Sequence, residues 1–176
     1  MAFADPQTNI EALGLELGMK VADIGAGIGA YAFAAARKVG SNGRIYAIDV
    51  QHELLAKLKG EARKLHIENI ETVWADIEMR NGTKLRDALV DAVIVSNILF
   101  QVGEKRGLVG EVKRILRKDG RVLVIDWAES FGGLGPAPKD VYKKEEARAL
   151  FIGEGFQFIT EFDAGDHHYG LVLTKK

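Results

Sequence analysis

Three closely spaced glycines follow the first short apolar segment of the chain. Gly25, Gly27 and Gly29 alternate with Ala26 and Ile28 directly after residues 21–24. Glycine lets a backbone turn tightly and approach a ligand closely, because it has no side chain to obstruct either. Asp49 lies twenty residues after Gly29, and a carboxylate at that distance can accept hydrogen bonds from both hydroxyls of a ribose. The spacing therefore predicts a nucleoside site.

Asp23 helps to separate two classes of nucleoside ligand. Gly25, Gly27 and Ala30 also satisfy the G-x-G-x-x-A pattern of dinucleotide-binding proteins, so the glycines alone do not decide. A negative charge two residues before Gly25 would disfavour a pyrophosphate, whereas a cationic amino-acid sulfonium would tolerate it or gain from it. Asp23 therefore favours a nucleoside joined to a cationic group over a dinucleotide.

Polar residues recur where the predicted strands end. The expected strands comprise residues 21–24, 44–49, 71–75, 92–95 and 121–125. The polar residues at or beside their ends are Asp23, Asp49, Asp76, Asn97 and Asp126. Ligands bind outside the carboxyl ends of the strands in an open parallel sheet, so these side chains are expected along one rim.

Helical spacing of apolar residues follows most of these strands. The expected helices comprise residues 30–39, 51–66, 108–116 and 140–152. Alternating strands and helices predict right-handed crossovers on a parallel sheet. Residues 156–162 and 169–174 are strands too close together for a crossover, so they form a hairpin. The predicted fold is α/β: a mostly parallel, seven-stranded sheet with one antiparallel strand from the C-terminal hairpin and helices on both faces.

Length and composition favour one domain without covalent cross-links. The chain has 176 residues, a net charge of −1 and no cysteine, so this chain can form neither a disulfide nor a thiolate site. The charge argues against a nucleic-acid footprint, and no apolar run has the length of a signal peptide or membrane span. We expect a cytoplasmic protein without membrane contact. The expected parts are an N-terminal lid helix (1–17), a cofactor-binding core (18–127) and a substrate-side loop, helix and hairpin (128–176).

Four segments together resemble the signature motifs of class I S-adenosylmethionine-dependent methyltransferases, which have a Rossmann-like fold. They are residues 21–29, 45–49, 74–77 and 115–121. Many relatives have Pro-Gly before the fifth strand where this chain has Lys118-Asp119. The likeness covers nearly the whole chain and is specific for the family, but it hardly restricts the substrate.

The resemblance implies how the methionine end of the cofactor would be held. The backbone of Gly25, Ala26 and Gly27 would line the methionine part, with Asp23 nearby. Asn97 and its backbone would lie near the methionine part and the transferred methyl group.

The same resemblance assigns the nucleoside end. Asp49 would bind the ribose hydroxyls and Val50 would pack on adenine. Asp76 would accept from the exocyclic amine of adenine, with Ile77 beside the ring. Simpler interpretations remain open, because Asp49 could cap the following helix and Asp76 could cap a turn.

Residues on the acceptor side are less clearly indicated. Asp126, His167 and His168 are candidates for catalysis, and a histidine has a suitable unperturbed pKa for a general base. Trp127 and Glu129 are candidates for substrate contact beside them. All of these could equally be surface or turn residues.

Further candidates surround this site. Phe3 and Tyr31 could cover the cofactor. Two adjacent histidines without a third defined partner are a weak metal motif, so no metal site is expected.

The expected chemistry is in-line displacement of a sulfonium methyl group. The Asn/Asp-Pro-Pro-Tyr/Phe motif of amino-methylating relatives is absent, since residues 96–99 read Ser-Asn-Ile-Leu. Without cysteine, the thiol-dependent mechanisms of arsenite and pyrimidine-carbon methyltransferases are excluded for this chain. A small-molecule or exposed acceptor is expected, with RNA or protein acceptors and a homodimer left open. The alternatives are a non-catalytic S-adenosylmethionine-binding subunit and an NAD-binding oxidoreductase.

Overall fold

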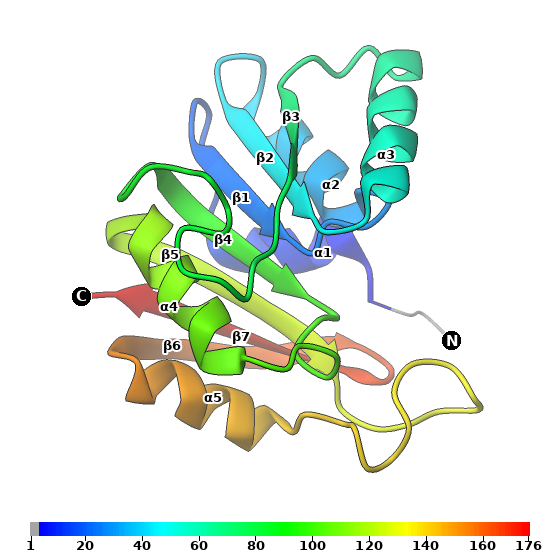
Figure 1. Ribbon diagram of the computed structural model, residues 1–176, viewed down its shortest axis with the longest axis vertical. Helices are drawn as coiled ribbons and strands as arrows, with labels where there is room; N and C mark the ends of the chain where they lie inside the picture. Colours follow the sequence, from blue (N-terminus) through cyan, green and yellow to red (C-terminus); the bar gives the residue numbers. More distant parts are fainter. Residues whose placement is uncertain (1–3) are drawn as a thin grey trace.

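A seven-stranded sheet forms the centre of the computed structural model, which describes residues 4–176 (Figure 1). The strands are β1 (Lys20–Ile24), β2 (Arg44–Asp49), β3 (Ile70–Trp74), β4 (Val90–Ser96), β5 (Leu116–Trp127), β6 (Phe156–Gly165) and β7 (His168–Lys175). Their order is β3-β2-β1-β4-β5-β7-β6. The first five strands pair in parallel, and β7 is antiparallel to both β5 and β6. The predicted topology is confirmed.

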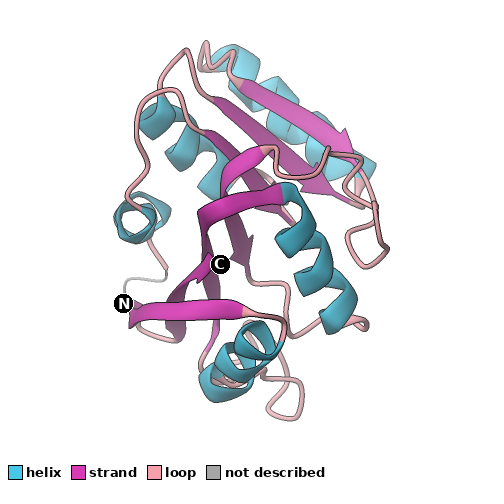
Figure 2. Ribbon diagram, turned by 90° about the vertical axis from the view of Figure 1, so that its left-hand side faces the viewer, coloured by secondary structure: helices cyan, strands magenta, loops and turns pink. Residues whose placement is uncertain are grey.

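Helices cover both faces of this sheet (Figure 2). They are α1 (Pro6–Asn9), the 3₁₀ helix η1 (Ile10–Leu13), α2 (Ala30–Val39), α3 (His52–Lys64), α4 (Lys105–Ile115) and α5 (Lys144–Gly153). Alternate residues of each central strand point to opposite faces, so two apolar layers form. One layer joins the sheet to α4 and α5, and the other joins it to η1, α2 and α3.

Among the boundaries that differ from the predicted ones are those of the N-terminal segment, α5 and β5. The N-terminal segment forms two short helices, α1 and η1, rather than one lid helix, and Phe3 lies outside the described residues. Helix α5 begins at Lys144 instead of residue 140, and the Lys143 backbone amide donates to the Glu146 carboxylate at 3.0 Å at this start. Strand β5 begins directly after α4, at Leu116 rather than at residue 121, so Lys118-Asp119 lies within this strand.

Within the described part of the chain, no helix is long and apolar enough to cross a lipid bilayer.

Candidate functional site

A cavity of about 530 Å³ opens at the carboxyl ends of β1, β2 and β4. Eight of the nine predicted cofactor residues line it: Gly25, Ala26, Gly27, Asp49, Val50, Asp76, Ile77 and Asn97. The ninth, Asp23, is buried at the end of β1 beside the glycine turn. The parallel register brings these residues together, because β1 lies between β2 and β4.

The glycine turn is shaped by the backbone and by close packing. Gly25 has a φ of 71°, and a Cβ atom there would lie 2.4 Å from a side-chain carbon of Ile98. A side chain at this position would therefore be strained and would collide with the loop after β4. Gly27 also has a positive φ, and nothing lies within 4 Å of its missing Cβ. The turn thus presents bare backbone to the cavity.

Asp49 braces this turn from the end of β2. Its Oδ2 accepts a hydrogen bond from the Gly27 amide and its Oδ1 accepts one from the Gln51 amide, each at 2.8 Å. A carboxylate has about four lone-pair sites, so both oxygens can accept further hydrogen bonds from the cavity. Asp49 can therefore hold the loop, fix the start of α3 and bind a diol at once.

Asp23 is a buried carboxylate without an evident partner. It is 1% exposed, and neither carboxylate oxygen has a hydrogen-bond partner within normal geometry among the described residues. Burial raises the pKa of Asp23 to about 7, and the charge of Asp49 adds to this increase. The Ala32 amide opposes the increase, although it does not meet the geometry of a hydrogen bond with either oxygen. Buried charges in proteins are normally paired. An unpaired carboxylate beside a cavity therefore fits a ligand that brings a positive charge.

Asn97, directly after β4, combines an uncommon backbone conformation with a second unsatisfied polar atom. It has a φ of 54°, and its backbone N–H donates to the Ile125 carbonyl at 2.8 Å. Its buried side-chain Oδ1 has no hydrogen-bond partner among the described residues. Residues held in sparsely populated conformations often occur at functional sites. Asn97 thus offers a second unsatisfied polar atom to the same cavity.

The opposite wall of the cavity is the loop after β3. Asp76 is exposed and accepts a hydrogen bond from the Glu78 amide, while Glu78 accepts one from the Glu104 amide at 2.7 Å. Trp74 donates its indole N–H to the Val50 carbonyl at 2.9 Å. The apolar rim at Val50 is therefore tied to the end of β3.

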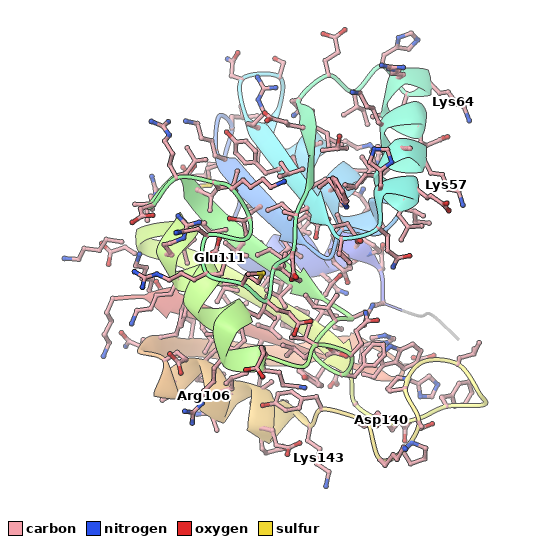
Figure 3. All side chains as sticks on the ribbon, in the orientation of Figure 1. Lys57, Lys64, Arg106, Glu111, Asp140 and Lys143 are labelled. Carbon is pink, nitrogen blue, oxygen red and sulfur yellow. The ribbon has the colours of Figure 1, made fainter. Side chains whose placement is uncertain are left out.

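Glu111 on α4 anchors the following part of this loop (Figure 3). Its buried carboxylate accepts hydrogen bonds from the amides of Asn81 and Thr83, from the Thr83 hydroxyl and from the guanidinium of Arg114. Although burial opposes it, these contacts lower the pKa of Glu111 to about 2. Arg114 also pairs with Asp87 at 2.6 Å. A loop without regular structure is thus held by one charged side chain.

Replacing Glu111 by glutamine is expected to lower the free energy of unfolding by about 2 kcal/mol, because an uncharged amide cannot satisfy all these donors. Thermal unfolding measures the effect, and the exposed Glu68→Gln variant is the control. Because the folded-state pKa is depressed, the contribution of Glu111 is present above its unfolded pKa and is lost as the pH falls toward 2. An unchanged melting temperature in E111Q would contradict this role.

Tyr31 lines the cavity and is held by the N-terminal segment. The buried amide of Asn9 donates to the Tyr31 hydroxyl at 3.1 Å and to the Ala164 carbonyl at 2.9 Å. Burial raises the pKa of Tyr31 to about 12, so the phenol stays protonated. One side chain of α1 therefore joins α2 to the end of β6.

The variant Asn9→Ala is expected to lose about 1.5 kcal/mol of stability, since the Ala164 carbonyl would lose a buried donor. Denaturant unfolding of N9A beside Gln7→Ala, an exposed change on the same helix, measures it. Equal unfolding midpoints for the two variants would refute the role of Asn9.

The three catalytic candidates occupy different surroundings. Asp126 is fully buried and accepts hydrogen bonds from the Leu99 and Trp127 amides, each at 2.8 Å. His168 is buried against the Trp127 ring, whereas His167 is partly exposed and pairs with Glu129. Asp126 thus holds the loop after β4, and His167 is the candidate nearest to solvent.

Among the other residues that line the cavity, Gln51, Leu54, Glu78 and Gln101 were not predicted as cofactor contacts. Leu54 lies in the helix predicted over residues 51–66, and Gln101 follows the end of β4. Sequence spacing could not distinguish a cavity residue from a core residue here, because helical periodicity does not reveal which end of an apolar stripe lines a cavity.

The fold and the cavity together define a Rossmann-like methyltransferase class. A family model described as "Methyltransferase domain" matches residues 15–163, and the chain belongs to this family. The chain also resembles a crystal structure of an S-adenosylmethionine-dependent methyltransferase from Aquifex aeolicus. That similarity has a TM-score of 0.89 and 27% identity, and it covers 98% of this chain and 90% of the other.

Two curated relatives are longer than this chain. An arsenite methyltransferase from Halobacterium salinarum is 30% identical over 124 residues, which are 70% of this chain and 30% of the relative. The ubiquinone/menaquinone biosynthesis C-methyltransferase UbiE from Cronobacter sakazakii is 26% identical over 161 residues, which are 91% of this chain and 61% of the relative. The chain therefore spans less than two thirds of either relative.

Proposed function

We propose that this protein transfers a methyl group from S-adenosylmethionine to a small-molecule acceptor. One observation carries the proposal: a buried, unpaired carboxylate, Asp23, lies beside a bare glycine turn that Asp49 braces. A cationic amino acid joined to a nucleoside satisfies both features, whereas a pyrophosphate would meet the repulsion of Asp23. Membership of the methyltransferase family supports the same ligand.

The residues of the cavity divide the cofactor between them. The backbone of Gly25, Ala26 and Gly27 would line the methionine part, with Asp23 beneath it and Asn97 near the methyl group. When bound, S-adenosylmethionine supplies an electrophilic methyl group on a sulfonium. The chain then has to orient this group and exclude water from it.

The nucleoside would lie toward β2 and β3. Asp49 would accept from the ribose hydroxyls, and Asp76 would accept from the exocyclic amine of adenine. Val50 would pack on adenine, and Ile77 would lie beside the ring.

The acceptor is proposed to be a small molecule. Among residues 4–176, the charged residues lining the cavity are Asp49, Asp76 and Glu78, without lysine or arginine, so the lining does not favour a polyanion such as RNA. The names of the two curated relatives refer to arsenite and to quinone biosynthesis. The arsenite chemistry is a poor match, because thiolates are absent from this chain. A second copy of the chain could complete the open side of the site as a homodimer.

Calorimetric titration with S-adenosylmethionine, S-adenosylhomocysteine and NAD tests the proposal. Micromolar binding of the first two, without binding of NAD, is the expected result. Binding of NAD alone would overturn the proposal in favour of an oxidoreductase. Binding of S-adenosylmethionine without turnover on any acceptor would instead identify a cofactor-binding subunit.

A further inference from the structure

Helix α4 holds the loop that follows β3 at two points. The carboxylate of Glu78 accepts a hydrogen bond at 2.7 Å from the Glu104 amide, at the start of α4. Further along the helix, the carboxylate of Glu111 accepts from the amides of Asn81 and Thr83, each at 3.0 Å. In Figure 1 this loop runs beside α4 on its way from β3 to β4. The helix therefore fixes the path of the loop.

Glycine at position 107 allows α4 to approach this loop closely. A Cβ atom on Gly107 would overlap with the backbone carbonyl of Glu78, which cannot turn away as the end of a flexible side chain could. Gly110 lies on the same helix and has nothing within 4 Å of its missing Cβ. The missing side chain at position 107 is therefore required for the contact with the loop, whereas no contact depends on it at position 110.

The loop also folds back on itself beside Asp76. The Gly82 amide donates to the Met79 carbonyl at 2.8 Å, which closes a turn. A Cβ atom on Gly82 would overlap with the Asp76 carbonyl, so the two ends of the loop are in direct contact. A displacement of the loop on α4 would therefore move Asp76 as well.

Glu78 connects these contacts to the cavity. Its backbone amide donates to Oδ1 of Asp76 at 3.0 Å, so the direction of the Asp76 carboxylate depends on where Glu78 lies. This bond uses Oδ1 and leaves Oδ2 for a ligand. Asp76 and Glu78 both line the cavity, whereas Gly107 does not. A contact outside the cavity therefore controls the direction of a carboxylate inside it.

We propose that Glu78 and Gly107 are positioning residues that make the nucleoside end of the cavity selective for adenine over its oxo analogue, hypoxanthine. This inference rests on the function proposed above, in which Asp76 accepts from the exocyclic amine of adenine. A carboxylate held in place accepts from that amine and repels a carbonyl oxygen at the same ring position. A carboxylate that is free to shift can accept instead from the adjacent ring N–H of hypoxanthine. Holding the loop against α4 therefore determines the selectivity.

Calorimetry with two ligands tests this inference: S-adenosylhomocysteine, and S-inosylhomocysteine, in which a carbonyl oxygen replaces the amine of adenine. The unmodified protein is expected to bind the first about 30-fold more tightly, because Asp76 can bond to its amine. Gly107→Ala displaces the Glu78 carbonyl, so the preference is expected to fall to about three-fold. Gly110→Ala makes the same change on the same helix without a clash, and it is expected to keep the full preference.

A second pair of variants tests the side chain of Glu78. Glu78→Ala removes the acceptor of the Glu104 amide, and it is expected to lower the preference to about three-fold. Glu78→Gln keeps an acceptor oxygen, so it is expected to retain most of the preference. Thermal unfolding shows which variants are folded, and this pair decides the inference if Gly107→Ala is not.

The ratio of the two affinities separates positioning from a merely structural role, which would weaken both ligands alike. The inference is overturned if G107A has the same preference as G110A, or E78A the same as E78Q. It is also overturned if the unmodified protein binds both ligands equally. In each of these cases S-adenosylhomocysteine still binds and the methyl-transfer proposal survives. If S-adenosylhomocysteine does not bind to the unmodified protein, both proposals fail.

Discussion

Replacing Asp49 by alanine is expected to weaken the binding of S-adenosylmethionine and S-adenosylhomocysteine by about a hundred-fold or more. The carboxylate would accept two hydrogen bonds from the ribose, and bonds to a charged group contribute about 1.5–3 kcal/mol each. The variant also removes the acceptor of the Gly27 amide, so the glycine turn loses its brace. Both cofactor forms should be affected alike, because they share the ribose.

Titration calorimetry measures this loss, and thermal unfolding shows whether the variant is folded. Asp140→Ala removes an exposed carboxylate elsewhere in the chain and should leave both affinities unchanged. Asp49→Asn keeps one acceptor oxygen and should bind with intermediate affinity. If D49A binds S-adenosylhomocysteine as tightly as D140A does, the assigned ribose site is wrong.

Replacing Asp23 by asparagine is expected to stabilise the protein without ligand and to weaken cofactor binding. Burial has raised the pKa of Asp23 to about 7, so keeping its charge in the folded state costs stability at higher pH. Removing that charge should raise the free energy of unfolding at pH 8 by about 2 kcal/mol. The melting temperature should rise by about 4–8 °C.

The pH dependence follows from the same shift. Because the pKa of Asp23 is raised in the folded state, its contribution to stability is fully present below its unfolded pKa and is lost as the pH rises through 7. The advantage of D23N over the unmodified protein should therefore be large at pH 8 and should disappear near pH 4. A difference in melting temperature that does not change with pH would contradict this explanation.

The cost to binding has the opposite sign. Without a counter-charge for the cationic ligand, D23N is expected to bind S-adenosylmethionine about 30-fold or more weakly. Calorimetry on the same samples measures it, with Asp140→Ala as the control. An affinity unchanged by D23N would mean that Asp23 does not face the charged end of the cofactor.

Much of the fold could be predicted because its signals are local. Continuous apolar runs indicate buried strands, helical spacing indicates the covering helices, and the short gap between residues 156–162 and 169–174 requires a hairpin. The predicted cofactor residues also follow from local order. Each lies in or directly after a strand, and the carboxyl ends of parallel strands meet at one rim.

Contacts between distant segments could not be read in this way. Nothing in the sequence indicated that Glu111 would bind the loop at residues 81–83, or that Asn9 would donate to the Ala164 carbonyl. Such contacts depend on how the helices pack on the sheet. Helix α5 starts later than predicted, at a point where the Glu146 carboxylate accepts from the Lys143 backbone amide.

The sequence by itself determined which residue types stand at the strand ends, and therefore the class of ligand that the rim can bind. Only the tertiary structure distinguished the neighbouring candidates Asp126, His167 and His168. Side-chain direction alternates along a strand, and the burial of each side chain depends on what packs above it. The structure therefore directs Asp126 to the backbone of the loop after β4, buries His168 against Trp127, and pairs His167 with Glu129.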